Sequence, residues 1–111
     1  MAGSKTRIMY IELKSDHNDA GPARIGRVSF SKTGRTIYYQ GKAFRSTTQS
    51  ASGGNYFEVE SRNEYWISGP KKNGMDRHWA GAGPVQIDAD IAADYWREIR
   101  QCDPPENPYL A

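Results

Sequence analysis

The chain is divided into short segments of alternating apolar and polar residues, with glycine, proline and small polar residues separating them about every ten positions. Residues 23–30 show the alternation most clearly, because Gly26, Val28 and Phe30 share one face of an extended chain and Arg27 lies on the other. A period of two is the pattern of a half-buried strand. The sequence therefore predicts a mainly β fold.

Turn residues define the limits of the expected strands. Gly34 ends a four-residue loop and Gly41 separates two short strands, both at positions where glycine permits a reversal of the chain. The expected strands cover residues 7–13, 23–30, 35–39, 42–47, 55–60 and 64–68, with a short edge strand at 85–87. Six or seven short strands predict a strongly bent antiparallel sheet that closes into a small barrel or roll. A flat sheet beneath a helix is the alternative.

One C-terminal helix is expected over residues 89–101. Asp88 is a suitable N-cap, and a stripe of apolar residues at helical spacing follows it. The prolines at 104 and 105 end this helix. We therefore expect one β-rich domain over residues 1–102, with its helix at about 88–101, and a flexible tail over 103–111.

The 111 residues suffice for a single domain. Cys102 is the only cysteine, so no disulfide can form within the chain and a reducing compartment is expected. No apolar run is long enough to cross a membrane, and residues 1–6 lack the apolar segment of a secretory signal. These features predict a cytoplasmic protein without membrane contact.

The charge of the chain is unevenly distributed. The net charge is only +2, but residues 20–57 contain six basic residues and no acidic residue. Such a segment can form a basic face that attracts an anionic partner, or it can be the solvated side of ordinary strands.

Three motifs resemble a group of small uncharacterised bacterial proteins of about 100 residues. The motifs are GPARIGRVSFSKTG at 21–34, NYFEVE at 55–60 and YWISGPKK at 65–72, and the resemblance covers residues 8–100. Some members of that group are labelled 1-deoxy-D-xylulose-5-phosphate synthase. An enzyme of that kind is several times longer and must enclose thiamine diphosphate, for which this chain has neither the motif nor the bulk. The resemblance therefore implies a family of small bacterial proteins and no activity.

No catalytic, metal or cofactor site is predicted. One cysteine and two distant histidines do not provide a zinc site, and the turn containing Asp16, His17 and Asp19 is more typical of backbone capping. Ser68, His78 and Asp76 can be combined into a hydrolytic trio, but no nucleophile-elbow motif accompanies them. A small enzyme is accordingly the least favoured function.

Two binding functions remain. The first is a protein-protein adaptor, in which exposed strand edges and the long loop at 71–84, with Met75 and Trp79 as anchors, contact a partner. The alternative is a single-stranded nucleic-acid binder with a basic, aromatic face. The candidate binding surface comprises Arg27, Arg35, Tyr38, Arg45, Trp66, Lys71, Lys72, Arg77 and Trp79.

Overall fold

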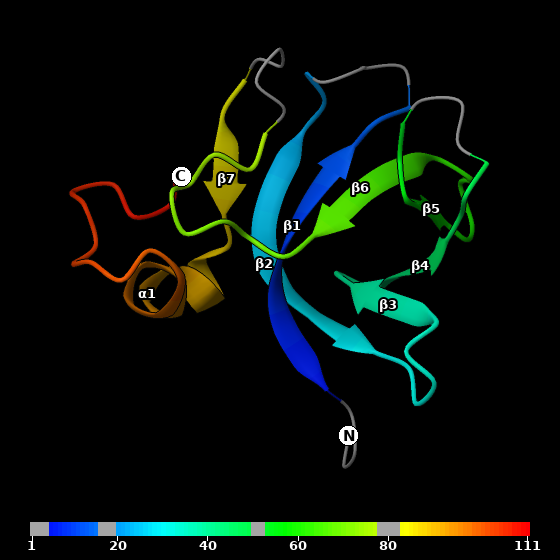
Figure 1. The fold of residues 1–111 in the computed structure, drawn as a ribbon, viewed down its shortest axis with the longest axis horizontal. Coiled ribbons are helices and arrows are strands. Elements are labelled where there is room, and N and C mark those ends of the chain that lie inside the picture. The colour runs from blue at the N-terminus through cyan, green and yellow to red at the C-terminus, as the bar shows by residue number, and fades with distance from the viewer. Residues whose placement is uncertain (1–4, 16–19, 50–52, 78–82) are drawn as a thin grey trace.

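The structure is a computed structural model that describes residues 5–15, 20–49, 53–77 and 83–111. Within these residues, seven strands precede a short helical segment (Figure 1). The strands are β1 (Thr6–Leu13), β2 (Ala23–Phe30), β3 (Thr36–Tyr39), β4 (Lys42–Ser46), β5 (Tyr56–Glu58), β6 (Glu64–Ser68) and β7 (Val85–Ile87). The mainly β fold with one C-terminal helix, predicted from the alternation, is confirmed.

Strands β1 to β6 form a closed antiparallel barrel. Each strand pairs with the next along the chain, and β1 also pairs with β6, which closes the ring. The closing register places Ile11 opposite Ile67, and β1 pairs along most of its length with β2. Of the predicted architectures, the barrel is therefore correct and the flat sheet is not. The seventh strand, β7, lies parallel to β2 outside this ring.

The tightest turn joins β3 to β4. Gln40 and Gly41 both have positive φ angles, of 49° and 76°, and Tyr39 pairs directly with Lys42. Two central residues with positive φ define the hairpin turn whose twist matches that of the flanking strands. Gln40 thus accepts a backbone conformation that non-glycine residues seldom adopt, and the corner predicted at Gly41 is a two-residue hairpin.

The alternation along β1 divides the core into two layers. Met9 and Ile11 point into the barrel, whereas Tyr10 points outwards to the helical segment. The interior cluster consists of Met9, Ile11, Val28, Ile37, Tyr39, Phe44 and Ile67. The outer cluster consists of Tyr10, Ala23, Ile25, Val85, Ile87, Ile91, Ala92, Tyr95 and Trp96. Because β1 and β2 are covered on both faces, they carry apolar residues on both.

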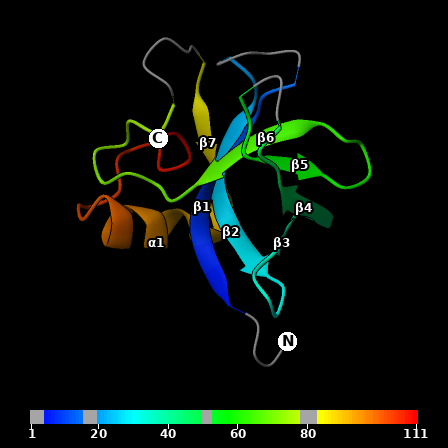
Figure 2. The same cartoon turned by 45° about the vertical axis from the view of Figure 1, so that its right-hand side comes forward.

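The helical segment lies against the outside of β1 and β2 (Figures 1 and 2). It begins as a 3₁₀ turn, η1 (Ala89–Ile91), continues as one α turn, α1 (Ala92–Asp94), and ends as a π turn, η2 (Tyr95–Ile99). The N–H of Arg100 donates to the carbonyl of Tyr95 at 3.1 Å, the wider spacing of a π turn. The helix therefore ends earlier than the predicted Gln101, and its geometry is irregular.

Two further expectations differ from the structure. Asp88 precedes the helical segment, but its side chain makes no capping hydrogen bond. Its carboxylate instead accepts hydrogen bonds from Tyr39 and Arg24. The expected flexible tail ends beside β7, where the N–H of Ala111 donates to the carbonyl of Val85 at 2.9 Å. No helix of the described residues is both long enough and apolar enough to cross a membrane.

Candidate binding surface

Four consecutive strands present large side chains on the outside of the barrel. Because Ile37, Phe44 and Ile67 point inwards, their neighbours in sequence point outwards. These outward residues are Tyr38 on β3, Arg45 on β4, Phe57 on β5 and Trp66 on β6. Together with Arg62 they are called the outer face below.

The strand register places Arg45 next to Phe57 on the outside of the barrel. Arg45 is paired directly with Phe57, and Tyr38 is paired with Ala43 on the same strand as Arg45. Directly paired residues on one face of an antiparallel sheet have Cβ atoms about 5 Å apart. Arg45 thus lies directly opposite Phe57 on the outside of the barrel, and because its direct partner on β3 is Thr36, Tyr38 lies diagonal to it.

Arg62 adds a second cation to this group. It lies in the turn between β5 and β6 with a φ of 66°, and its guanidinium carbon is 5.5 Å from the centre of the Phe57 ring. A cation over an aromatic face holds the ring in place while leaving its own N–H groups available. Phe57 therefore has Arg45 opposite it on β4 and the Arg62 guanidinium over its ring.

Two aromatic rings of the outer face are substantially exposed. Tyr38 is 46% exposed and Trp66 is 38% exposed, whereas Phe57 is half-buried. The indole N–H of Trp66 donates to the hydroxyl of Ser68 at 3.0 Å, which fixes the orientation of the ring. Tyr38 on β3 and Trp66 on β6 are separated by β4 and β5. Exposed aromatic side chains of this kind are the usual platforms for stacking bases.

Acidic residues only partly offset the positive charge. Glu58 points into the barrel and is buried, and it accepts a hydrogen bond from Ser61 at 2.5 Å. Glu64 is paired with Phe57 at the β6 side of the outer face, and Glu60 is exposed in the turn after β5. The outer face therefore has Arg45 and Arg62 next to Phe57, with Glu64 opposite Phe57 on β6.

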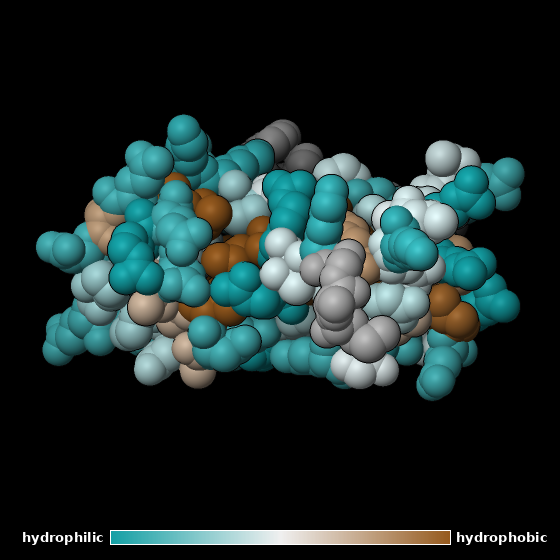
Figure 3. Space-filling view, turned by 90° about the horizontal axis from the view of Figure 1, so that it is seen from below, coloured by the Kyte–Doolittle hydropathy of each residue, from teal (hydrophilic) through white to brown (hydrophobic). Residues whose placement is uncertain are grey.

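A basic groove lies at the end of the barrel where β1 begins and β2 turns into β3. Its volume is about 610 Å³, and Lys5, Arg7 and Lys32 line it together with Phe30 and the backbone of the β2–β3 turn. None of the described residues that line it is acidic. Figure 3 views the molecule from this end and shows a mainly hydrophilic surface with small, separate hydrophobic areas. The three basic side chains therefore make the groove suited to an anion.

The opposite end of the interior contains a smaller cavity of about 260 Å³. Tyr39, Phe44 and Tyr65 form its aromatic wall, with Arg24 and Lys42 among the other lining residues. The rings of Phe44 and Tyr65 pack edge to face with centres 4.9 Å apart. Burial raises the pKa of Tyr39 well above its usual range, and its hydrogen bond to Asp88 raises the pKa further. The Tyr39 hydroxyl is accordingly protonated at neutral pH and donates a hydrogen bond that links the barrel to Asp88.

Not all predicted surface residues belong to the outer face. Arg27 lies on β2 and forms an ion pair with Asp94 at 3.3 Å, and Arg35 is exposed just before β3. Lys71 and Lys72 are exposed after β6. Trp79 lies outside the described residues. The predicted surface is thus divided among several parts of the molecule.

Arg77 has a different environment from the one predicted. Its side chain is only 10% exposed and lies 3.5 Å from the buried carboxylate of Glu12. It also donates hydrogen bonds to the carbonyl oxygens of Gly21, Gly83 and Pro84. Arg77 therefore connects the loop after β6 to the barrel, and its environment does not suit contact with a partner.

Glu12 is the centre of a buried polar cluster beneath this loop. It is 1% exposed, accepts a hydrogen bond from the Tyr10 hydroxyl at 2.5 Å and forms an ion pair with Lys14 at 3.1 Å. Burial raises the pKa of Tyr10 well above its usual range, with a further contribution from Glu12. Burial also raises the pKa of Asp76, which accepts the backbone N–H of Lys71. These hydrogen bonds and the ion pair give the cluster a structural role.

The hypothetical reactive groups are only partly within the described residues. His78 of the trio, and Asp16, His17 and Asp19 of the turn, lie outside them. Within the described ranges, no three His, Cys, Asp or Glu side chains are close enough together to hold a metal ion.

The sequence did not predict that Phe57 and Arg62 belong to a binding surface. Phe57 alternates with Val59, and an apolar pair of that kind predicts the buried face of a strand. The structure places both on the outside, with Val59 38% exposed and its N–H donating to the carbonyl of Ala43. Only the register could have revealed that Arg62 lies over Phe57.

Comparisons of the chain with protein-family models, with curated proteins and with solved structures gave no match.

Proposed function

We propose that this domain is a non-catalytic binding module whose outer face binds single-stranded nucleic acid. The observation that supports this most directly is the pairing of Arg45 with Phe57, whose ring lies beneath the Arg62 guanidinium. Two arginines next to Phe57, with exposed Tyr38 on β3 and exposed Trp66 on β6, supply positive charge for phosphates and aromatic rings for bases.

The expected mode of binding is stacking combined with charge. Each base that stacks on an aromatic side chain contributes about 1–3 kcal/mol, and the contribution depends little on the identity of the base. Arg45 and Arg62 contact phosphates. Lys5, Arg7 and Lys32 of the basic groove attract the same polymer at the end of the barrel. We therefore expect weak sequence preference and strong dependence on salt.

A protein partner is the second candidate, supported by Met75, which is 63% exposed after β6. The expectation of exposed strand edges has less support, because each of the six barrel strands is paired on both sides. The other anchor, Trp79, lies outside the described residues. We therefore place the adaptor function after nucleic-acid binding.

The test is a titration of a fluorescently labelled single-stranded oligonucleotide, followed by anisotropy at low and moderate salt. Tyr38→Ala and Arg45→Glu should each weaken binding by at least about fivefold, the equivalent of about 1 kcal/mol. Double-stranded DNA should bind more weakly, because its bases are not available for stacking.

Two matched variants serve as controls. Tyr109→Ala removes a comparably exposed aromatic ring, and Arg97→Glu reverses an exposed charge on the helical segment. Both should bind like the wild type. Equal losses in controls and outer-face variants, or no binding by the wild type at low salt, would refute the proposal.

A further inference from the structure

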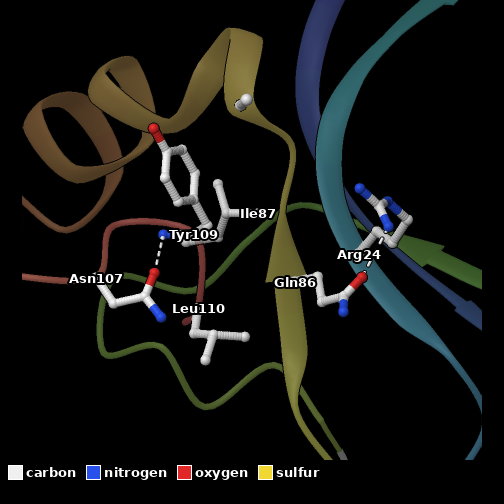
Figure 4. A pocket seen from close by; sticks show the side chains of 7 residues that line it. Arg24, Gln86, Ile87, Asn107, Tyr109 and Leu110 are labelled. Carbon is white, nitrogen blue, oxygen red and sulfur yellow. Dashed lines mark hydrogen bonds between the residues drawn. The ribbon is translucent and has the colours of Figure 1, made fainter.

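The outer edge of β7 is paired with a segment of the same chain. The N–H of Ile87 donates to the carbonyl of Tyr109 at 2.8 Å, and the N–H of Ala111 donates to the carbonyl of Val85 at 2.9 Å. Between these two bonds, Gln86 and Leu110 form an antiparallel bridge. In Figure 4, residues 107–110 lie on one side of β7 and Arg24 of β2 lies on the other. Residues 109–111 therefore act as an additional edge strand.

This strand is attached mainly through backbone groups. Its side chains are largely free, since Tyr109 is 51% exposed and Leu110 is 42% exposed. The indole N–H of Trp96 donates to the carbonyl of Pro108 at 2.8 Å, which is again a contact to the backbone. Release of residues 108–111 therefore breaks only a few backbone hydrogen bonds, and water replaces the lost partners.

The connection before this strand favours an extended path. Residues 101–106 are exposed and contain the pair Pro104 and Pro105. Consecutive prolines prefer the extended polyproline conformation. In the monomer the connection nevertheless loops out beyond the helical segment and returns to β7 (Figure 1). An extended connection would carry residues 108–111 away from their own β7.

We propose that two copies of this chain exchange residues 108–111, so that each segment pairs with β7 of the other copy. The exchanged dimer retains every hydrogen bond described above, because the same donors meet the same acceptors. Exchange of identical segments is a low-cost route to a two-fold symmetric dimer. The extended connection replaces the returning one, which offsets part of the cost of association.

The geometry of the bridge provides a direct test. The flanking hydrogen bonds identify Gln86 and Leu110 as a non-hydrogen-bonded pair, in which the Cα atoms are about 4.5 Å apart. That distance falls within the range of a disulfide. The test protein carries Gln86→Cys and Leu110→Cys together with Cys102→Ser, and it is purified reduced and then oxidised at a series of concentrations.

Exchange predicts disulfide-linked dimers on a non-reducing gel. The ratio of dimer to monomer should rise about tenfold for a tenfold increase in concentration while the monomer predominates. A control with Gln86→Cys and Glu106→Cys in the same background measures collisional cross-linking, because the bridge partner of Gln86 is Leu110 and Glu106 is exposed. Disulfides within single chains alone, at every concentration, would refute exchange, as would dimers no more abundant than in the control.

The chain without substitutions provides a second measurement. Light scattering after size-exclusion chromatography should detect a dimer at high concentration, and deletion of residues 108–111 should abolish it. Replacement of Pro104 and Pro105 by glycine should lower the dimer fraction, since a flexible connection returns more easily to its own β7. A dimer that survives the deletion would contradict the proposal.

Discussion

The hydroxyl of Tyr39 donates a hydrogen bond of 2.5 Å to the carboxylate of Asp88, and the two groups meet directly over Gly26. Tyr39 belongs to the barrel interior, whereas Asp88 joins β7 to the helical segment. Arg24 completes the arrangement by donating to the other carboxylate oxygen of Asp88 at 2.7 Å. This contact links the closed barrel to the elements packed outside it.

Gly26 is essential to this contact. A Cβ atom at position 26 would lie 2.3 Å from the Asp88 carboxylate and 2.6 Å from the Tyr39 ring. Gly26→Ala should therefore lower the free energy of unfolding by about 3 kcal/mol, from overpacking and the displaced hydrogen bond. Urea denaturation followed by tryptophan fluorescence measures the change. Gly69→Ala is the control, because its Cβ would meet only the Arg7 guanidinium, at 3.4 Å. Equal losses in both variants would contradict the prediction.

The two buried tyrosines predict a loss of stability at alkaline pH. The pKa values of Tyr10 and Tyr39 are raised in the folded state, whereas unfolded tyrosine titrates near pH 10. Above about pH 10 the unfolded chain releases protons that the folded chain retains, so stability falls by about 1.4 kcal/mol per pH unit for each tyrosine.

Tyr39→Phe isolates one of these contributions. The variant should be less stable than the wild type at pH 8, because Asp88 loses a hydrogen-bond donor, and this difference should shrink as the pH rises above 10. Urea denaturation of both proteins at pH 8, 10 and 11 gives the difference in their unfolding free energies. A difference that stays constant over this interval would show that Tyr39 makes no contribution to the alkaline loss.

Arg77 is expected to act on stability through Glu12. Arg77→Gln removes one of the cations around a carboxylate that is 1% exposed, so a loss of about 3 kcal/mol in unfolding free energy is expected. The double variant Glu12→Gln with Arg77→Gln should lose less than the sum of the single losses, since neither charge is then left alone. Lys72→Gln, at an exposed position in the same loop, should change stability by less than about 0.5 kcal/mol. If the stability losses of the two single variants simply add in the double variant, Arg77 and Glu12 do not interact in the folded protein.

The proposed nucleic-acid interface makes a separate prediction about salt. Arg45→Gln should reduce the slope of log affinity against log salt concentration by about 1, because one phosphate contact is lost. Tyr38→Ala should weaken binding without altering the slope, because stacking releases no counterions. Anisotropy titrations at four salt concentrations distinguish the loss of a phosphate contact from the loss of stacking. A slope altered equally by both variants would show that Tyr38 acts indirectly.

The sequence predicts the barrel because local patterns determine most of it. The faces of β2 follow from the alternation of Gly26, Val28 and Phe30, and the hairpin before β4 follows from Gly41. Closure of the ring is compatible with six short strands but is not encoded locally, since it depends on the pairing of β1 with β6. The helical segment is shorter than predicted because a π turn at residues 95–99 replaces regular α spacing.

The candidate site is less predictable because exposure depends on which face of each strand turns inwards. Phe57 and Val59 read as core residues, yet Glu58 is the one that points inwards, where Ser61 provides a hydrogen bond. The sequence predicts Arg77 to be a free cation in a loop, yet it forms an ion pair with the buried carboxylate of Glu12 on β1. The orientation of Glu58 depends on Ser61 in the following turn, and the burial of Arg77 depends on Glu12, which is distant in sequence.

The double pairing of β1 has a consequence for the order of events during synthesis. The chain emerges with β1 first, but the strand that seals the ring against it, β6, ends only at Ser68. Until then the edge of β1 that faces β6 has no partner, and contacts between segments so distant in sequence form slowly. During synthesis this edge of β1 therefore stays unpaired while β2 to β5 are added, and it is protected only once β6 is complete.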